Sequence, residues 1–103
     1  MQNIYNIPTP KKGEESIKEL YKTNQVSINH IRSNSYVLSH WYIQEEDEWL
    51  VLFEGEATLE IEGKELILQR GDTFFIPAKR RHRVLSTSED AQWLTVHMNA
   101  THA

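Results

Sequence analysis

The chain has 103 residues, which is enough for one domain but leaves no room for two hydrophobic cores. Its 15 acidic and 11 basic side chains give a net charge of −4, which argues against a protein that wraps nucleic acid or docks on an anionic membrane. It has five histidines and no cysteine, so disulfides, thiolate metal sites and a cysteine nucleophile are excluded, and a metal would need nitrogen or oxygen ligands.

Residues 1–24 are expected to form an N-terminal arm followed by a short helix. Pro8 and Pro10 indicate an extended arm. From Glu14 to Lys22 the apolar residues recur at helical spacing behind acidic residues, which predicts a helix. The N-terminus lacks the pattern of a secretory signal, and no segment reaches the ~20 apolar residues that span a bilayer. We therefore expect a cytoplasmic protein.

Residues 25–100 change to a period of two, which predicts a single β-barrel. The expected strands are short runs separated by turns. They start at Gln25 and continue at Ser35–Ile43, Trp49–Phe53, Ala57–Ile61, Glu65–Gln69, Thr73–Ile76, Arg81–Leu85 and Gln92–Met98. The run Trp49–Phe53 is apolar throughout, which predicts a strand buried on both faces. About eight short strands at turn spacings of roughly 8–12 residues favour an all-β sandwich or barrel.

Two groups of residues in this region are spaced in a recognisable way. Gly71, Pro77 and His82 are separated by five and four residues, and Glu48 is followed by six residues and Gly55. This spacing resembles the two motifs of the cupin superfamily, and the likeness covers about residues 26–98. The resemblance is to a small single-domain cupin of the cupin 2 type. It implies a double-stranded β-helix, also called a jelly-roll barrel.

In that family, two histidines of the first motif, its glutamate and the histidine of the second motif bind a divalent metal inside the barrel. Glu48 and His82 match the glutamate and the second-motif histidine, and the histidine pair falls on Tyr42 and Gln44 or, with a spacer one residue longer, on Trp41 and Ile43. Tyr42 and Gln44 are the better chemical match, because Trp and Ile side chains cannot coordinate a metal. The first metal motif is therefore degenerate, because its histidine pair is missing. Phenol and amide oxygens can coordinate a metal, so the resemblance implies an oxygen-rich site for Mn, Fe, Ni or Zn, with manganese or ferrous iron favoured over zinc. The alternative is a polar pocket in which Glu48 and His82 pair without a metal.

Two further histidines are candidates for the same pocket. His40 lies two residues before Tyr42 and shares its strand face. His97 shares a face with Trp93 and Thr95, but the pattern does not decide whether this face looks into the barrel. We expect the other two histidines to lie outside the site. They are His30, on a peripheral strand, and His102, in the C-terminal tail.

Residues 79–83 form the one basic cluster of the chain. It could bind an anion or nucleic acid. The simpler interpretation is a solvated outer face that pairs with the acidic residues Glu56, Glu60 and Glu62 of a neighbouring strand.

Two functions are compatible with these observations. The first is a metal-dependent enzyme acting on a small organic substrate, for which the resemblance implies oxygenase, isomerase or decarboxylase chemistry. The second is a metal-free, non-catalytic module that binds or senses a small molecule. The resemblance also implies a homodimer. A DNA-binding regulator would need an additional helical domain that 103 residues do not contain.

Overall fold

The computed structural model describes residues 1–99, and in this range its regular secondary structure is almost entirely β-strand. One turn of 3-10 helix, η1, precedes the strands. The elements are η1 (Ile4–Asn6), β1 (Glu15–Lys22), β2 (Val26–Ser33), β3 (Glu46–Glu54), β4 (Ala57–Ile61), β5 (Lys64–Leu68), β6 (Thr73–Ile76), β7 (His82–Thr87) and β8 (Ala91–Asn99). The prediction of an all-β barrel is confirmed.

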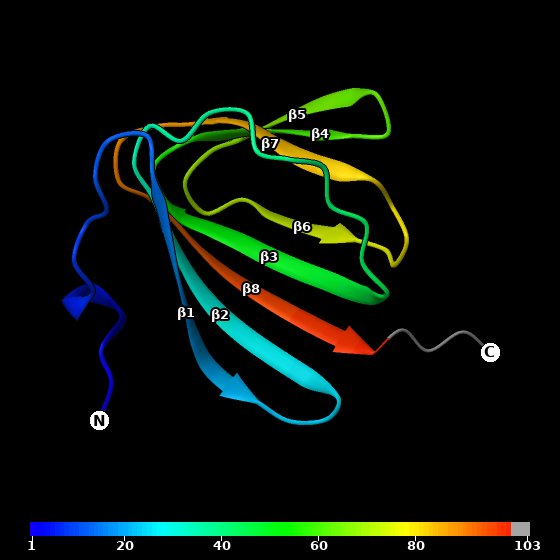
Figure 1. Cartoon of the computed structure of the whole chain (residues 1–103), viewed down its shortest axis with the longest axis horizontal. Helices are drawn as coiled ribbons and strands as arrows, with labels where there is room; N and C mark the ends of the chain where they lie inside the picture. Colours follow the sequence, from blue (N-terminus) through cyan, green and yellow to red (C-terminus); the bar gives the residue numbers. More distant parts are fainter. Residues whose placement is uncertain (100–103) are drawn as a thin grey trace.

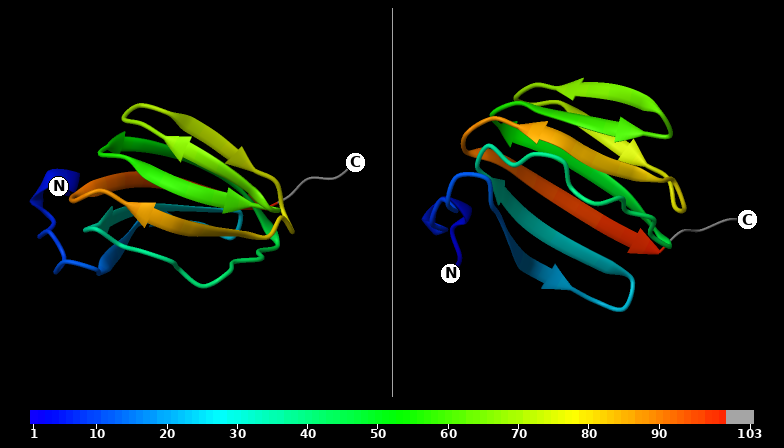
Figure 2. Two further views of the ribbon diagram at one scale, coloured as in Figure 1. Left: turned by 90° about the horizontal axis from the view of Figure 1, so that it is seen from above. Right: turned by 45° about the horizontal axis from the view of Figure 1, so that its top comes forward.

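The strands form two antiparallel sheets that face each other (Figures 1 and 2). The larger sheet has the order β1-β2-β8-β3-β6, and the smaller has the order β5-β4-β7. The chain crosses from the large sheet to the small one after β3 and returns through β6 and β8. Because strands distant in sequence become neighbours, side chains from β3, β7 and β8 can meet between the sheets.

The hydrophobic core lies between the two sheets. Its buried members come from both layers, and they are Leu50, Leu52, Ala57, Leu59, Leu68, Ile76, Ala91 and Trp93. Their alternation along each strand follows from the period-two geometry of β-structure, in which successive side chains point to opposite faces. The sequence expectation that Trp49–Phe53 is buried on both faces is wrong. Leu50 and Leu52 are buried, whereas Trp49 is 38% exposed on the outer face.

The predicted N-terminal helix is also wrong. Residues Glu15–Lys22 form β1, an edge strand paired with β2, and the only helical turn among residues 1–99 is η1. A bulge between Glu19 and Tyr21 inserts one residue and breaks the alternation of the strand. The bulge allows a sequence with helical apolar spacing to be accommodated in a strand. A helix this short is marginal alone, so pairing with β2 decides the conformation.

The strand predicted at Ser35–Ile43 is absent. The segment instead crosses the open side of the barrel as an irregular chain, held by two isolated bridges to β7, Val37 to Ser86 and Tyr42 to His82. Ser35 has a positive φ of 49°, which is incompatible with a continuous strand. Within residues 1–99, no helix is long and apolar enough to cross a membrane.

Candidate functional site

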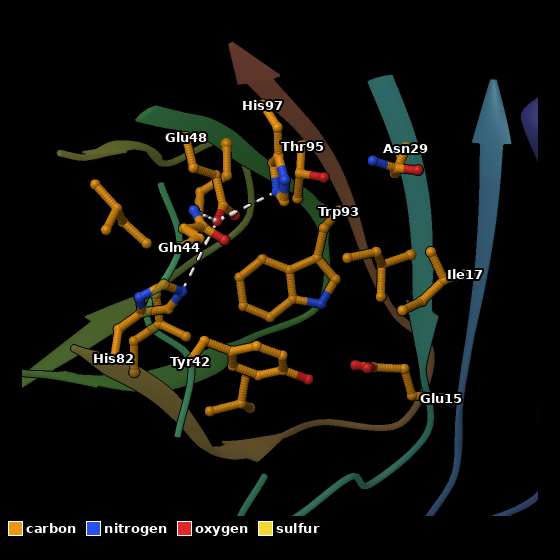
Figure 3. A pocket seen from close by; sticks show the side chains of 15 residues that line it. Glu15, Ile17, Asn29, Tyr42, Gln44, Glu48, His82, Trp93, Thr95 and His97 are labelled. Atoms are coloured by element: carbon orange, nitrogen blue, oxygen red, sulfur yellow. Dashed lines mark hydrogen bonds and ion pairs between the residues drawn. The ribbon is translucent and has the colours of Figure 1, made fainter. Parts of the chain in front are cut away.

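A cavity of about 200 Å³ lies between the two sheets (Figure 3). Its walls are apolar over most of their area, and polar side chains gather at two places. The lining residues are Glu15, Ile17, Asn29, Ile31, Tyr42, Gln44, Glu48, Leu50, Leu59, Ile76, His82, Val84, Trp93, Thr95 and His97. We name the group Gln44, Glu48, His82 and His97 the first pole, and the group Glu15, Tyr42 and Trp93 the second pole.

The pairing of β3 with β8 brings two members of the first pole together. Glu48 lies directly opposite His97 in this antiparallel register. Directly opposite residues share a sheet face, so the inward orientation of Glu48 carries His97 into the cavity. This resolves the question that the sequence left open, because the face of β8 with Trp93, Thr95 and His97 looks into the barrel.

The irregular segment before β3 positions the other two members. Tyr42 and His82 exchange two backbone hydrogen bonds, with nitrogen-to-oxygen distances of 2.7 and 3.0 Å. The carbonyl of Gln44 accepts a 2.8 Å hydrogen bond from the N–H of Lys79. These contacts fasten the segment to the chain entering β7, and they direct the Gln44 and His82 side chains toward β3.

One carboxylate oxygen is the centre of the first pole. Oε1 of Glu48 accepts a hydrogen bond of 2.8 Å from Nε2 of Gln44 and lies 3.3 Å from Nε2 of His97. Nε2 of His82 lies 3.8 Å from the same oxygen. The side chains of Glu48 and His82 are each 9% exposed, and that of His97 is 29% exposed. A buried carboxylate needs such partners because an isolated charge in the interior is costly.

These contacts shift the ionisation of both members of the Glu48–His97 pair. Burial alone would raise the pKa of Glu48, but hydrogen bonds from His97 and Gln44 and the nearby imidazoles hold that pKa below its usual value. The hydrogen bond to Glu48 raises the pKa of His97 above its usual value, against the opposing effect of burial. The pair therefore favours a carboxylate beside an imidazolium.

A hydrogen bond shows which nitrogen of the His82 ring carries a proton. Its Nδ1 lies 2.9 Å from the carbonyl oxygen of Arg80, which can only accept a hydrogen bond, so Nδ1 carries a proton. In the neutral ring Nε2 then carries the lone pair, and this atom faces the carboxylate of Glu48. Nε2 of His82 and Oε1 of Glu48 lie 3.8 Å apart inside the cavity.

The first pole fits a hydrogen-bonded cluster better than a resident metal ion. Its donor types, two imidazoles, a carboxylate and an amide, are ones that bind divalent metals. Their arrangement differs, because the carboxylate lies between the rings of His82 and His97, which approach it from opposite sides (Figure 3). Among residues 1–99 no three His, Asp or Glu side chains are placed to hold one ion. We therefore assign no step to a metal.

The structure places the other predicted site residues at different distances from this cluster. The hydroxyl of Tyr42 is directed away from Glu48 and toward Glu15 (Figure 3), while its ring stacks 5.7 Å from that of His82. His40 is exposed and does not line the cavity, but its ring packs 4.3 Å from that of Tyr42. His30 lies outside the site and is buried, bonded to Gln92. His102 lies outside the described residues.

Sequence reasoning missed two polar cavity residues. Glu15 was assigned to a helix, but β1 brings its carboxyl to the cavity, where Oε2 accepts a 3.1 Å hydrogen bond from Ser33. Thr95 was noted only as a neighbour of His97, yet it is 3% exposed and its hydroxyl has no hydrogen-bond partner among residues 1–99. A buried, unpartnered hydroxyl beside a cavity is a group that a ligand can satisfy. The period-two pattern of β8 was the available signal for Thr95.

The lysine and the three arginines of the basic cluster at residues 79–83 lie on the outer surface, whereas His82 lines the cavity. Arg80 pairs with Glu62 at 2.6 Å and Arg83 pairs with Glu60 at 2.7 Å, which confirms the predicted pairing with the acidic strand. Arg81 and Arg83 each lie 4.2 Å from the ring of Trp41, a contact that the sequence analysis did not anticipate.

Comparison with known proteins gives consistent matches. A family model described as a cupin domain matches residues 33–97. Among solved structures, the chain is similar to a Ralstonia eutropha protein provisionally described as a mannose-6-phosphate isomerase, with a TM-score of 0.85 and 31% identity over 97% of this chain and 98% of that one. No curated protein matches the chain.

Two more distant solved structures share the fold. A cupin superfamily protein from Desulfitobacterium hafniense has a TM-score of 0.81 and 15% identity, covering 94% of this chain and 87% of that one. KdgF from a Halomonas species has a TM-score of 0.80 and 16% identity, covering 97% of this chain and 92% of that one.

Proposed function

This chain belongs to the cupin family, and from that premise we propose that its barrel binds a small organic molecule and moves a proton on it. The observation that carries the proposal is the imidazole of His82 beside the carboxylate of Glu48, with Nε2 and Oε1 3.8 Å apart in the cavity. His82 is thus placed to act as a base, with the Glu48 carboxylate next to it.

The step fits isomerisation through an enolate. His82 takes a proton from a carbon beside a carbonyl group, and the electron pair of that C–H bond moves into the carbonyl. Protonated His97 provides positive charge at the same pole for the oxygen that becomes negative. When that carbon carries a hydroxyl group, as in hydroxyacetone, the product is an enediolate. His82 then returns the proton to the former carbonyl carbon, and the hydroxyl proton passes to the oxygen that became negative, so the hydroxyl carbon becomes the new carbonyl. Atoms and electrons balance, and no oxidant or second reactant is needed.

The cavity limits the size of the ligand. About 200 Å³ is smaller than the ~300–1,000 Å³ of typical pockets for drug-sized molecules. Apolar residues such as Leu59, Ile76 and Val84 surround the ligand body, while the first pole contacts its reacting group. The description of the Ralstonia neighbour as an isomerase supports the same class of reaction.

The competing function is metal-dependent chemistry, with Mn, Fe, Ni or Zn held by Gln44, Glu48 and His82. One observation favours it. Metal-binding histidines usually donate their second N–H to a carbonyl or carboxylate, and His82 donates Nδ1–H to the carbonyl of Arg80. Such an ion would polarise a substrate oxygen.

One experiment separates the two functions. Metal-depleted protein without a histidine tag is mixed with hydroxyacetone in D2O, and deuterium incorporation at carbon is followed by NMR. We expect acceleration over buffer that is lost in His82→Gln and kept in Arg81→Gln, a matched control on the outer surface. Absence of acceleration by the metal-free protein, or acceleration that His82→Gln retains, would contradict the proposal. Stoichiometric bound metal that disappears in His82→Ala would establish the metal-dependent function instead.

The outer face of the large sheet suits a homodimer. Trp49 lies opposite Phe75 on β6 and opposite Val96 on β8, which gives an apolar row across three strands. Trp49 and Phe75 are 38% and 46% exposed. Burial of such a row between two copies would be favourable. Light scattering should give a dimer mass, and Trp49→Glu should give a monomer. A monomeric unsubstituted protein would refute this assembly.

A further inference from the structure

The cavity has a second polar pole on the far side of the Trp93 indole. Figure 3 shows the carboxyl of Glu15 and the hydroxyl of Tyr42 directed toward one another, with the indole nitrogen of Trp93 on the same side of its ring. The first pole lies on the other side of the indole (Figure 3). A ligand that fills the cavity therefore meets polar groups at both ends.

Glu15 is the acidic member of the second pole. Its Oε2 accepts the hydrogen bond from Ser33, and no other hydrogen bond to this carboxyl occurs within residues 1–99. Burial raises the pKa of Glu15, more than the Ser33 hydrogen bond and the charge of His40 lower it. A carboxyl that is desolvated without full compensation gains from a hydrogen-bond donor or a cation.

The lining of the cavity contains nothing that would neutralise an anion at this pole. None of the fifteen described lining residues is Lys or Arg. The imidazole of His97 belongs to the first pole, where it faces Glu48. Phosphate sites ordinarily use arginine, lysine or the N-terminus of a helix, and within residues 1–99 the only helical element is the three-residue turn η1. An anionic group at the second pole would face the carboxyl of Glu15 without a counter-charge.

We propose that Glu15 selects a ligand that presents an uncharged hydroxyl or a cationic ammonium group to the second pole, and that this pole rejects a phosphate or other anionic group. The inference rests on the proposed function, since it assumes that the ligand occupies this cavity. It assigns to this chain a substrate class different from the sugar phosphate in the description of the Ralstonia neighbour. Tyr42 and Trp93 contribute donors that orient the group beside Glu15.

The test uses four probes with one three-carbon skeleton. They are 1,3-propanediol, 3-amino-1-propanol, 3-hydroxypropanoate and 3-hydroxypropyl phosphate. Binding to 15N-labelled protein is followed by the indole N–H signal of Trp93, whose ring forms the wall between the poles. The diol and the amine should bind at least about tenfold more tightly than the two anions, because like charges placed together are strongly unfavourable.

Two variants assign the discrimination to one residue. Glu15→Gln keeps a group that can accept the Ser33 hydrogen bond but removes the charge, so the preference for the amine over the phosphate should fall at least about tenfold. Glu14→Gln, at the exposed preceding residue, should leave the preference unchanged. Tight binding of the phosphate probe, or an unchanged preference in Glu15→Gln, would overturn the inference. If none of the four probes moves the Trp93 signal, the proposed function fails instead.

Discussion

Replacing His97 by Gln removes the cation that faces the buried carboxylate of Glu48. Breaking a fully buried ion pair costs about 3–5 kcal/mol, and a charge-assisted hydrogen bond contributes about 1.5–3 kcal/mol. The range for a charge-assisted hydrogen bond applies, because the His97 side chain is 29% exposed and solvent screens part of the interaction. Gln44 also continues to donate its 2.8 Å hydrogen bond. We expect a loss of about 2 kcal/mol near pH 6, which corresponds to a decrease in Tm of roughly 10 °C.

The effect depends on pH in a direction set by the two pKa shifts. The pKa of His97 is raised in the folded protein, so its stabilisation is complete below the unfolded value of 6.5 and is lost as the pH rises through the folded value. The pKa of Glu48 is lowered, so its stabilisation is present above 4.5 and is lost as the pH falls through the folded value. The difference between the two proteins is therefore largest around pH 5–6.5 and decreases toward pH 9.

Urea denaturation of both proteins from pH 5 to pH 9 measures this difference. His40→Gln is the matched control, because His40 is exposed and lies outside the cavity. A double-mutant cycle with Glu48→Gln isolates the coupling between the two side chains. A free-energy difference that stays constant over this pH range, or grows as the pH rises, would refute the assignment of His97 as the cation of the pair.

Three further predictions concern the framework of the barrel. Leu52 is fully buried, and Leu52→Ala should lower the free energy of unfolding by about 3 kcal/mol in a urea titration. Ile67 is exposed, and Ile67→Ala should change the same quantity by less than about 0.5 kcal/mol. Gly55→Ala should destabilise more than Gly63→Ala by calorimetry. Both glycines have φ near +83°, but a Cβ at Gly55 would lie 2.5 Å from a neighbouring hydroxyl, while Gly63 has open space. Burial lowers the pKa of His30, so stability should fall as the pH drops below 6.5, and His30→Gln should weaken that dependence in urea denaturation.

The sequence predicts the central part of the fold because local signals and tertiary structure agree there. The strand expected at Thr73–Ile76 is β6 with the same bounds, and the turn at Glu62–Gly63 joins β4 to β5. Alternation, turn residues and pairing all favour the same structure in this region. At the N-terminus the apolar spacing indicates a helix, whereas the chain pairs with β2 as an edge strand that a bulge interrupts.

The candidate site was predictable only in part. Motif spacing identified Glu48 and His82, and the same reasoning placed Gln44 near them. Period two shows which residues share a face, but it does not show which face is buried when both carry apolar and polar groups. The position of His97 therefore depended on its register with β3. The orientation of the Tyr42 hydroxyl depended on an irregular segment whose path no periodic pattern describes.

The first pole links three separately positioned parts of the barrel through one oxygen atom. Glu48 and His97 belong to the large sheet, His82 begins β7 of the small sheet, and Gln44 belongs to the segment that crosses between them. A ligand group that lies between His82 and Glu48 and forms hydrogen bonds with both side chains would bridge the two sheets. Ligand binding raises the free energy of unfolding by RT ln(1 + [L]/Kd). A ligand of this cavity should consequently raise the Tm of the unsubstituted protein more than that of His82→Gln, and an equal increase in both would show that it binds elsewhere.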